Sequence, residues 1–470
     1  MPPENIFVNT NLPPPTPSPV PVPQAVTLVP LPPVKKGFPK IIIVVLGIVV
    51  LLALVFLALK LIMGFKNTTT GQITWWGLWE DAPVVQPLID TYEAAHPGVK
   101  ITYVKQSQQD YRERLTSSLA KGTGPDIFAF HNSWVPMFSG DLASMPTSVM
   151  NPVDYSNTFY KIASSDLVNG NSIVGIPLEY DALTLYVNED IFSANGKTPP
   201  TTWDDVRTLA KELTIKNDQG EITQAGIALG RTENVDHWPE ILALMMAQNG
   251  VDLNNPTGVN AEGALTFFTN FSKVDGVWDA TLPSSTQAFE SGNLAMYIAP
   301  SWREFEIKQA NPNLNFKTYP VPQLPKENPT DPDITYATYW AQGVWAKSTN
   351  KTAAWDFLKF LSTQDSLQKM YQTESLTRDF GEPYPRVDMS QLLNTHPILG
   401  SIISQAPGAV SWYLDSQTSD GPTGINSLMA NYFGDAVNAV ANGQKSATDA
   451  LTTCAQGVAQ VLAQYHLTVK

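Results

Sequence analysis

Residues 175–214 read GIPLEYDALTLYVNEDIFSANGKTPPTTWDDVRTLAKELT, and this stretch decides the fold that we predict for the chain. It enters through Gly-Ile-Pro, continues as an apolar strand over 182–187, and reaches a helix that we expect to begin at Thr202. The Thr202 hydroxyl can accept hydrogen bonds from the free N–H groups at the start of that helix, and the side chain of Asp205 can form a hydrogen bond back to Thr202. Apolar residues then recur every three or four positions, which predicts one buried helix face: Val206, Leu209, Ala210 and Leu213.

The sequence before this stretch alternates between short apolar strands and amphipathic helices. Strand-like runs at 73–76, 99–104 and 125–130 alternate with helical patterns at 83–95 and 110–121. Such alternation predicts a parallel sheet with helices on both faces. A chain of 470 residues is also too long for a single hydrophobic core, so we expect two lobes.

The stretch resembles the crossover between the lobes of family 1 extracellular solute-binding proteins, the carbohydrate-type receptors of ABC importers. The shared pattern is a proline, a short polar segment, a strand ending in Val-Asn-Glu-Asp-Ile-Phe, and a later Pro-Thr-Thr-Trp-Asp-Asp unit. Gly122-Thr-Gly-Pro-Asp-Ile and the Phe-Glu-Ser-Gly-Asn-Leu-Ala-Met order within 288–303 resemble the same family. The resemblance covers about residue 71 to the end, and it implies a two-lobed α/β fold of periplasmic-binding-protein type II, the Venus-flytrap arrangement.

The resemblance and the composition together divide the chain into segments. We expect lobe 1 to contain 73–180 and 334–390, and lobe 2 to contain 181–333 and 391–470. Residues 1–40 hold 13 prolines without apolar periodicity, which predicts a disordered or polyproline II tail. A transmembrane anchor over 41–63 and a linker over 64–72 would join this tail to lobe 1.

The anchor is predicted from an apolar run of 19 residues at 41–59, IIIVVLGIVVLLALVFLAL. A helix of that length spans a bilayer, and Lys60 can extend its amine toward the interface. More lysines precede the run than follow it, which favours a cytoplasmic N-terminus: Lys35, Lys36 and Lys40 against Lys60 and Lys66. We therefore expect a single-pass protein of the cell membrane, with its solute-binding domain in the periplasm or on the external surface.

Composition and motifs exclude several classes of function. The net charge of −14 repels nucleic acid. The single cysteine, Cys454, allows neither an internal disulfide nor a cysteine-rich metal site. The five histidines follow no metal-binding spacing, and the common hydrolase and nucleotide-binding motifs are absent from the sequence. We therefore expect no metal, no cofactor and no catalytic residue, and we do not expect an enzyme.

A binding cleft fits the sequence better than a catalytic site. In doubly wound sheets ligands bind at the carboxyl ends of the strands, so the residues that follow each strand are the candidates. These residues are rich in indole, carboxylate and amide groups, which suit the apolar face and the hydroxyl rim of a sugar. The candidate ligand-binding residues are Trp79, Glu80, Asp81, His131, Asn132, Trp134, Tyr180, Asp181, Glu233, Asn234, Trp302, Trp340 and Asn431.

The family resemblance assigns roles to a few of these positions. Asp181 matches a carboxylate that follows the crossover proline, and Trp302 matches a stacking aromatic residue after the Ala-Met strand. Glu233 falls near an acid that precedes a Trp-Pro helix. Asn431 lies near a position that is aromatic in maltodextrin receptors, and this departure weakens an assignment to maltodextrin.

The predicted function is that of a monomeric, membrane-anchored receptor that closes its two lobes around a carbohydrate. The receptor would deliver the carbohydrate to the transmembrane permease subunits of an ABC importer. One alternative keeps the fold in a sugar sensor or adhesion module without a transporter, as the proline-rich tail suggests. Another is a receptor for a polyol, a polyamine or another small solute, and a third is an extracellular carbohydrate-active enzyme.

Overall fold

The computed structural model describes residues 48–55, 70–326, 328 and 330–467, which belong to two units divided between Asn67 and Thr68. In the first unit residues 48–55 are helical, and their apolar side chains are exposed. The remainder of the predicted anchor 41–63 lies outside the described residues, as do the tail 1–40 and most of the linker 64–72. No helix within the described residues combines the length and the apolar composition that a membrane crossing needs.

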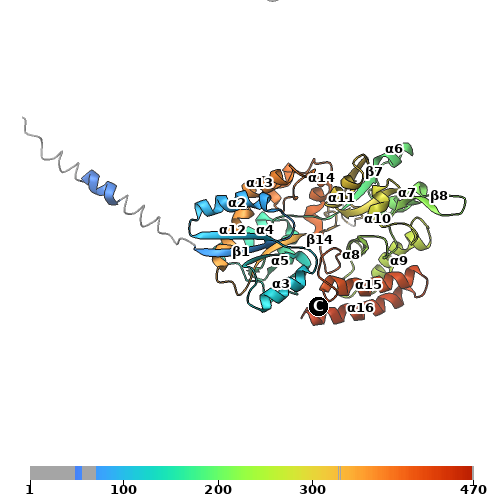
Figure 1. The fold of residues 1–470 in the computed structure, drawn as a ribbon. Coiled ribbons are helices and arrows are strands. Elements are labelled where there is room, and N and C mark those ends of the chain that lie inside the picture. The colour runs from blue at the N-terminus through green and yellow to red at the C-terminus, as the bar shows by residue number, and fades with distance from the viewer. Residues whose placement is uncertain (1–47, 56–69, 327, 329, 468–470) are drawn as a thin grey trace, which may run out of the picture. The chain divides into compact units, whose positions relative to one another are not determined.

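The first lobe of the second unit is built on a five-stranded sheet with the order β2-β1-β3-β13-β6 (Figure 1). Strand β1 runs parallel to β2 and β3, whereas β13 is antiparallel to β3 and β6. The strands are β1 (Gly71–Gly77), β2 (Val99–Lys105), β3 (Ile127–His131), β6 (Ile176–Pro177) and β13 (Trp340–Val344). The sheet therefore mixes a parallel core with an antiparallel return strand from late in the chain.

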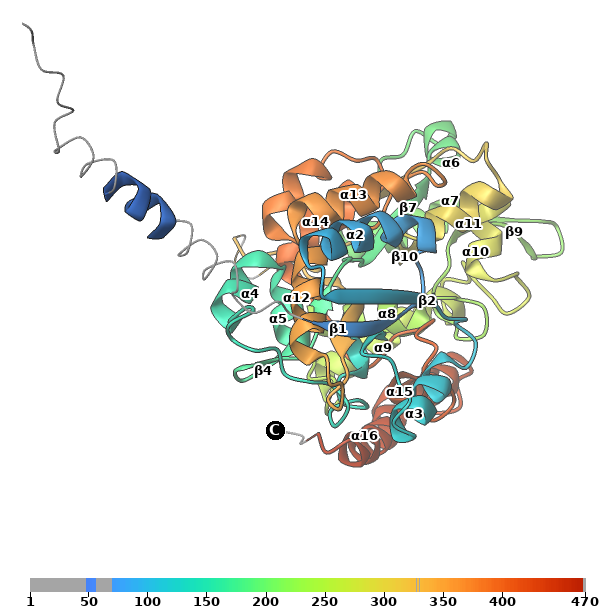
Figure 2. The ribbon, with the colours of Figure 1, turned by 60° about the vertical axis from the view of Figure 1, so that its left-hand side comes forward.

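Helices from an early and from a late part of the chain cover the first sheet. Helix α12 contacts β1, β13 and α2, and α13 packs against α2 (Figure 2). The elements of this lobe are α2 (Ala82–Ala95), α3 (Tyr111–Ala120), η1 (Asn132–Trp134), α4 (Pro152–Thr158), α5 (Lys161–Leu167), the hairpin β4 (Val168–Asn169) and β5 (Ser172–Ile173), α12 (Lys351–Leu361), α13 (Gln364–Glu374) and η2 (Val387–Leu392).

The second lobe is built on a sheet with the order β11-β7-β10-β9-β8. Strand β7 is antiparallel to β10 and β11, and β10 is parallel to β9. The strands are β7 (Leu183–Asn188), β8 (Ile215–Lys216), β9 (Ile222–Ile227), β10 (Leu294–Pro300) and β11 (Phe316–Tyr319), and the helices are α6 (Glu189–Ala194), α7 (Trp203–Leu213), α8 (Trp238–Gln248), α9 (Val259–Lys273), α10 (Ser285–Glu290) and α11 (Arg303–Ala310). The predicted alternation of strands and helices is confirmed in both lobes.

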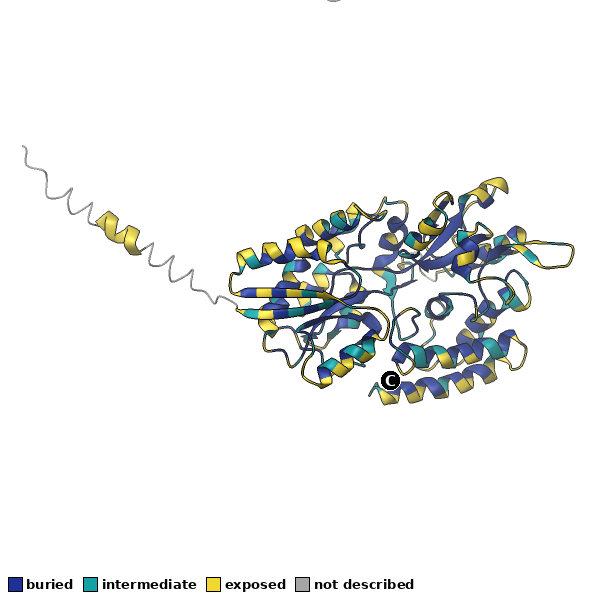
Figure 3. Cartoon of the chain, viewed as in Figure 1, coloured by how far each residue is buried: buried dark blue, intermediate teal, exposed yellow. Residues whose placement is uncertain are grey.

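The C-terminal helices pack against the second lobe. Helix α14 (Leu399–Gln405) contacts β7 and β11, while α15 (Ile425–Ala441) and α16 (Ala447–Gln464) lie side by side against α9 (Figure 1). The central strands of both sheets are buried, whereas the edge strands β2 and β8 and the outer faces of the helices carry exposed residues (Figure 3). Each lobe is therefore built around a sheet, and the buried residues of the two lobes form one continuous cluster.

The stretch 175–214 crosses between the sheets as the sequence predicts, because β6 belongs to the first sheet and β7 to the second. Helix α7 begins directly after Thr202, whose hydroxyl oxygen accepts from the N–H of Asp205 at 3.2 Å. Val206, Ala210 and Leu213 are buried on the inner face of this helix, and Leu209 is partly buried against the core. The predicted cap and the predicted buried face are both present.

Three chain segments run side by side where the lobes join. Strands β12 (Thr335–Tyr336) and β14 (Ala409–Val410) pair in parallel, and Ala182 forms a bridge with Ala337. The N–H of Thr338 donates to the carbonyl of Asp181 at 3.0 Å, and the N–H of Ala337 donates to the carbonyl of Val410 at 2.8 Å. We call 181–182, 335–338 and 409–410 the crossing segments. A narrow connection of this kind is the usual place for a hinge.

Candidate functional site

Four aromatic side chains gather where β1 and β3 end and β13 begins. The ring centroid of Trp340 lies 5.5 Å from that of Trp79, 5.3 Å from that of Trp134 and 5.4 Å from that of His131. Trp134 is fully buried, whereas Trp340 is 9% exposed and Trp79 is partly exposed. The structure therefore brings together four of the predicted site residues, of which Trp79 and Trp340 keep accessible surface.

His131 and Asn132 are held by polar contacts inside the first lobe. The Nδ1 atom of His131 lies 2.7 Å from Ser133 Oγ, and Nε2 lies 3.0 Å from Thr338 Oγ1 in a crossing segment. Burial lowers the pKa of His131 to about 3, so the ring is neutral at physiological pH. Asn132 donates its side-chain amide to Asp166 Oδ2 at 2.9 Å. The polar atoms of both residues are therefore occupied by contacts within the protein.

Asp181 connects the first crossing segment to the loop after β10. Its carboxylate accepts from the N–H of Ser301 at 3.1 Å, from the Ser301 hydroxyl at 2.9 Å and from the N–H of Trp302 at 3.4 Å. Burial raises the pKa of Asp181 to about 7. Because its oxygens already bind protein donors, the structure gives Asp181 the role of holding the loop that carries Trp302.

The Trp302 indole lies in the second lobe beside two basic side chains. The Arg303 guanidinium carbon is 4.3 Å from the Trp302 ring centroid, and the His237 ring meets Trp302 edge-on at 5.8 Å. Arg303 Nε donates to His237 Nε2 at 2.9 Å, so the hydrogen of a neutral His237 ring is on Nδ1. Trp302 is partly buried and Arg303 also pairs with Glu306. The result is a rigid aromatic surface with a fixed positive charge against it.

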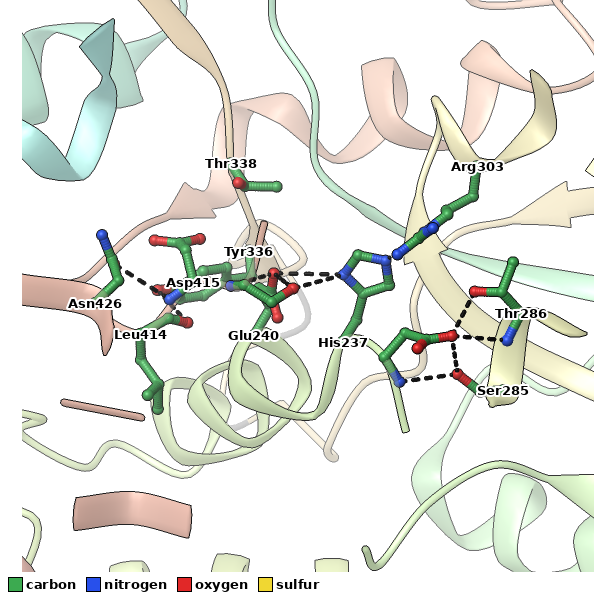
Figure 4. A network of polar contacts seen from close by, with 12 residues as sticks. His237, Glu240, Ser285, Thr286, Arg303, Tyr336, Thr338, Leu414, Asp415 and Asn426 are labelled. Atoms are coloured by element: carbon green, nitrogen blue, oxygen red, sulfur yellow. Dashed lines mark hydrogen bonds and ion pairs between the residues drawn. The ribbon is translucent and has the colours of Figure 1, made fainter. Parts of the chain in front are cut away.

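Figure 4 shows that this network continues from Arg303 and His237 to Glu240 and Asp415. Glu240 Oε1 accepts from the N–H of Ser416 at 2.8 Å and from its hydroxyl at 2.7 Å, and it lies 3.4 Å from His237 Nδ1. Asp415 is 3% exposed, and burial together with the nearby charge of Glu240 raises its pKa well above the usual value. The sequence analysis did not include Glu240 or Asp415, because 175 positions separate them and only the fold brings their segments together.

A second group of acids lies behind the aromatic cluster. Arg378 binds Glu374 at 2.9 Å and Glu382 at 2.7 Å, and Glu179 accepts from the N–H of Trp340 at 2.9 Å. Glu80 belongs to this group, and burial and the charge of Glu382 raise its pKa to about 7. Glu80 thus lies with other carboxylates rather than beside a free surface.

The predicted residue Tyr180 also lies away from the accessible part of the aromatic cluster. Its ring packs against Tyr160 with centroids 4.9 Å apart, and its backbone N–H donates to the carbonyl of Pro383 at 2.9 Å. The Tyr180 hydroxyl is buried without a hydrogen-bond partner among the described residues. Tyr180 therefore contributes to the core of the first lobe near the crossing.

Four other predicted residues do not join either part of the site. Asp81 is exposed and pairs with Lys105 at 2.7 Å. Glu233 is exposed and contacts its own neighbours, Arg231 and the N–H of Thr232. Asn431 lies on the exposed side of α15. Asn234 is buried, but its amide oxygen accepts from Trp278 and its amide nitrogen donates to two carbonyls. Three of these side chains therefore face solvent and the fourth is occupied by structural contacts, and their contact with a ligand stays a prediction.

Two cavities lie elsewhere on the second unit. One of about 400 Å³ is lined by Arg112, Glu113, Thr116, Ser117, Met137, Phe138 and Tyr465. The other, of about 160 Å³, is lined by Trp203, Met245, Asn249, Gly263, Ala264, Phe267 and Leu324. Neither contains a predicted site residue. Within the described part of the chain no group of three or more histidine, cysteine, aspartate or glutamate side chains is arranged to hold a metal ion.

Sequence comparison places the chain among binding proteins. Residues 76–367 match the sequence profile of bacterial extracellular solute-binding proteins. A binding protein of Brucella abortus is 23% identical over 300 residues, which cover 62% of this chain and 71% of that protein. The maltotriose-binding protein of Pyrococcus abyssi is 22% identical over 318 residues, which cover 64% of each chain.

Solved structures share the two-lobed fold. A cyclo/maltodextrin-binding protein complexed with maltotetraose is 16% identical, with a TM-score of 0.66 and coverage of 84% of this chain and 98% of that one. The cyclic α-maltosyl-1,6-maltose binding protein from Arthrobacter globiformis is 20% identical, with a TM-score of 0.67 and coverage of 84% and 100%. At these identities the likeness is one of fold, and it confirms the two-lobed α/β architecture that the sequence predicts.

Proposed function

Because the chain belongs to the family of bacterial extracellular solute-binding proteins, we propose that it captures a carbohydrate between its two lobes. The observation that carries this proposal is the placement of indoles on both lobes next to the crossing segments. Of these indoles, Trp79 and Trp302 are partly exposed and Trp340 is 9% exposed. Trp340 follows the crossing segment 335–338 in the first lobe. Trp302 in the second lobe is bound to Asp181 of the first crossing segment. A ligand held between them would contact both lobes.

The chemistry of these residues suits a sugar. The C–H face of a pyranose packs on an indole ring, and its hydroxyls need donors and acceptors with defined directions. The rings of His131 and His237 lie edge-on to the indoles of Trp340 and Trp302, at centroid distances of 5.4 Å and 5.8 Å. Fold relatives that bind maltotetraose and cyclic α-maltosyl-1,6-maltose support the carbohydrate class.

The proposed mechanism is closure about the crossing segments. The lobes are joined by short hydrogen-bonded segments, so a rotation there changes few backbone contacts. A ligand that contacts both lobes makes more interactions in the closed form, so it binds the closed form more tightly than the open form. The ratio of these two affinities sets how far the population shifts toward the closed form. The protein itself performs no reaction on the ligand in this proposal.

The transport partners and the location of the receptor are part of the same proposal. The closed, loaded receptor would present the carbohydrate to the transmembrane subunits of an ABC importer, and it would act as a monomer. The apolar run 41–59 supports a single membrane anchor, and the lysines around it support a cytoplasmic N-terminus. The solute-binding domain would then face the periplasm or the external surface.

The test is a binding screen on the purified full-length chain. Its melting temperature and tryptophan fluorescence are measured against oligosaccharides, monosaccharides, polyols, polyamines and peptides. A ligand that binds only the folded state at 100 times its dissociation constant adds about 2.7 kcal/mol of stability. A hit among the sugars, with the ligand recovered unchanged by chromatography, supports the proposal. A hit confined to another class contradicts the carbohydrate assignment, and a chemically altered sugar contradicts the receptor role.

A further inference from the structure

Three buried carboxylate oxygens at the junction of the lobes have no partner at full hydrogen-bond geometry among the described residues, and the neutral Thr338 hydroxyl is the one donor that acts on Asp415. They are both side-chain oxygens of Asp415 and Oε2 of Glu240. Asp415 is 3% exposed and Glu240 is 1% exposed. Figure 4 draws both residues: Glu240 Oε1 binds Ser416 and His237, whereas Asp415 is bound through its backbone N–H to Asn426. We call the two acids the Asp415–Glu240 pair.

The pair lies at the place where the two lobes and the C-terminal segment meet. Glu240 is in the first turn of α8 in the second lobe. The N–H of Asp415 donates to Asn426 Oδ1 at 3.3 Å, and the amide nitrogen of Asn426 donates to Ser133 Oγ in the first lobe at 2.8 Å. Ser133 in turn contacts His131 of the aromatic cluster. The pair is therefore connected to both halves of the proposed binding site.

The charged groups around the pair are mainly other acids. The charges of Asp166 and Asp420 also act on Asp415, but the oxygens of those two acids accept hydrogen bonds from protein donors. Within the described residues neither Asp415 nor Glu240 forms an ion pair with lysine or arginine. The nearest basic partner is His237, whose Nδ1 lies 3.4 Å from Glu240 Oε1, while Arg303 is engaged by His237 and Glu306.

A buried carboxylate without a partner is strongly unfavourable when it is ionised, so it needs a proton or a bound donor. The hydroxyls of a neutral sugar supply hydrogen bonds, but they leave the negative charge uncompensated. A protonated amine supplies both the hydrogen bonds and the opposite charge, and a charge-assisted hydrogen bond is stronger than a neutral one. The pair is thus better suited to an ammonium group than to a hydroxyl.

We propose that the ligand is a basic sugar, whose protonated amino group donates to the carboxylate of Asp415 beside Glu240. This inference rests on the proposed function, because it names the class of carbohydrate held at the same site. An amino sugar, or an oligosaccharide that carries a free amine, supplies the donor and the positive charge that Asp415 lacks. The indoles then bind the apolar faces of its rings.

The titration of Asp415 gives the proposal a characteristic pH dependence. Burial and the charges of Glu240, Asp166 and Asp420 raise the pKa of Asp415, so this carboxyl keeps its proton to a higher pH than an exposed aspartate does. Ammonium binding needs the ionised carboxylate, so the proton is released on binding. The affinity for an amine therefore rises as the pH rises through the pKa of Asp415, until the amine itself loses its proton. A neutral sugar shows no such rise.

The experiment compares three trisaccharides with the same β-1,4-linked backbone on the full-length chain. Chitotriose with free amines, its N-acetylated counterpart and cellotriose differ only in the group at each C2 position. The sugar panel of the binding screen is measured under the same conditions, and Asp415→Asn is compared with Asp435→Asn, an exposed acid on α15. We expect the free amine to bind about 10-fold or more tightly than both counterparts. Asp415→Asn abolishes this preference, and Asp435→Asn retains it.

The outcomes separate this inference from the proposed function. If the tightest sugar in the whole set is neutral, the inference is overturned while the carbohydrate receptor stands. That comparison uses the unmodified protein, so it decides the matter even where Asp415→Asn fails to fold. A free amine that binds equally well to Asp415→Asn also overturns it. If nothing in the set binds, the carbohydrate assignment fails and the amine assignment fails with it.

Discussion

At the scale of single residues, Asp181 shows how one carboxylate fixes an aromatic side chain at a domain junction. Its oxygens bind the N–H and hydroxyl of Ser301 and the N–H of Trp302, so the loop after β10 is tied to the first crossing segment. Asp181→Ala leaves these buried donors unpaired. We expect a loss of about 1–3 kcal/mol in the free energy of unfolding, together with weaker ligand binding. Urea denaturation checks the first effect, and an unchanged midpoint would contradict the role of Asp181.

Trp302 gives the most direct test of the site in the second lobe. Trp302→Ala removes the indole surface beside Arg303 and His237, and we expect about 10-fold or greater loss of affinity for the sugar found in the screen. Titration calorimetry measures the loss. Glu233→Gln is the matched control, because this predicted site residue contacts only its neighbours in the structure. Equal effects of the two substitutions would show that the site is misplaced.

The sequence predicts some of these residues better than others. Strand ends are readable from apolar runs, so the meeting of Trp79, His131, Trp134 and Trp340 follows from the expected sheet. Side-chain direction just beyond a strand is not set by that pattern. Glu80 turns inward and Asp81 turns to solvent, although they are adjacent. The Asp415–Glu240 pair depends on a contact between distant segments, which no local signal in a single sequence reveals.

At the scale of elements, the packing of α7 on β9 explains a glycine in the second sheet. A Cβ atom on Gly226 would lie 2.1 Å from the carbonyl oxygen of Ala210 in α7, so the helix lies directly on the strand backbone. Gly226→Ala forces the two elements apart. We expect a loss of about 1–3 kcal/mol in the free energy of unfolding. Gly140→Ala is the control, because no heavy atom lies within 4 Å of the added Cβ. Equal unfolding midpoints would contradict this packing.

Element boundaries follow closely from sequence signals where a cap is present. Thr202 and Ser446 each accept from the N–H three residues later, as their Ser/Thr-x-x-Asp patterns predict. The pairing of β12 with β14 was not predicted, because each strand has two residues and neither shows a periodic pattern. Short strands of this kind are set by the tertiary fold, so the crossing segments could be identified only in the structure.

At the scale of the whole molecule, the buried acids make stability depend on pH. Burial raises the pKa of Asp166 to about 6, of Glu80 and Asp181 to about 7, and of Glu374 to about 8. In the unfolded state the pKa of such a carboxyl is about 4. A carboxyl whose pKa is higher in the folded state binds its proton more tightly there, so protonation stabilises the fold. This stabilisation is complete only below the unfolded-state pKa. This contribution is lost progressively as the pH rises from about 4 through about 8.

We therefore expect the ligand-free protein to be more stable at pH 5 than at pH 8.5. The melting temperature, measured by calorimetry at constant ionic strength, should fall by several degrees between these two values. Glu374→Gln should reduce the difference, because it removes one of the acids with the highest pKa. A melting temperature that is flat or rises over this interval would contradict the raised pKa values of these buried acids.

The central claim is that a sugar closes the two lobes about the crossing segments, and a distance between the lobes tests it most directly. The single cysteine, Cys454, is buried, so spin labels can be placed at Gln109→Cys in the first lobe and Gln287→Cys in the second, both exposed positions. Pulsed electron paramagnetic resonance then gives the distribution of distances between the two labels, with and without the sugar from the screen. The account predicts a shift to one shorter, narrower distribution at saturation. An unchanged distribution with the sugar bound would contradict it.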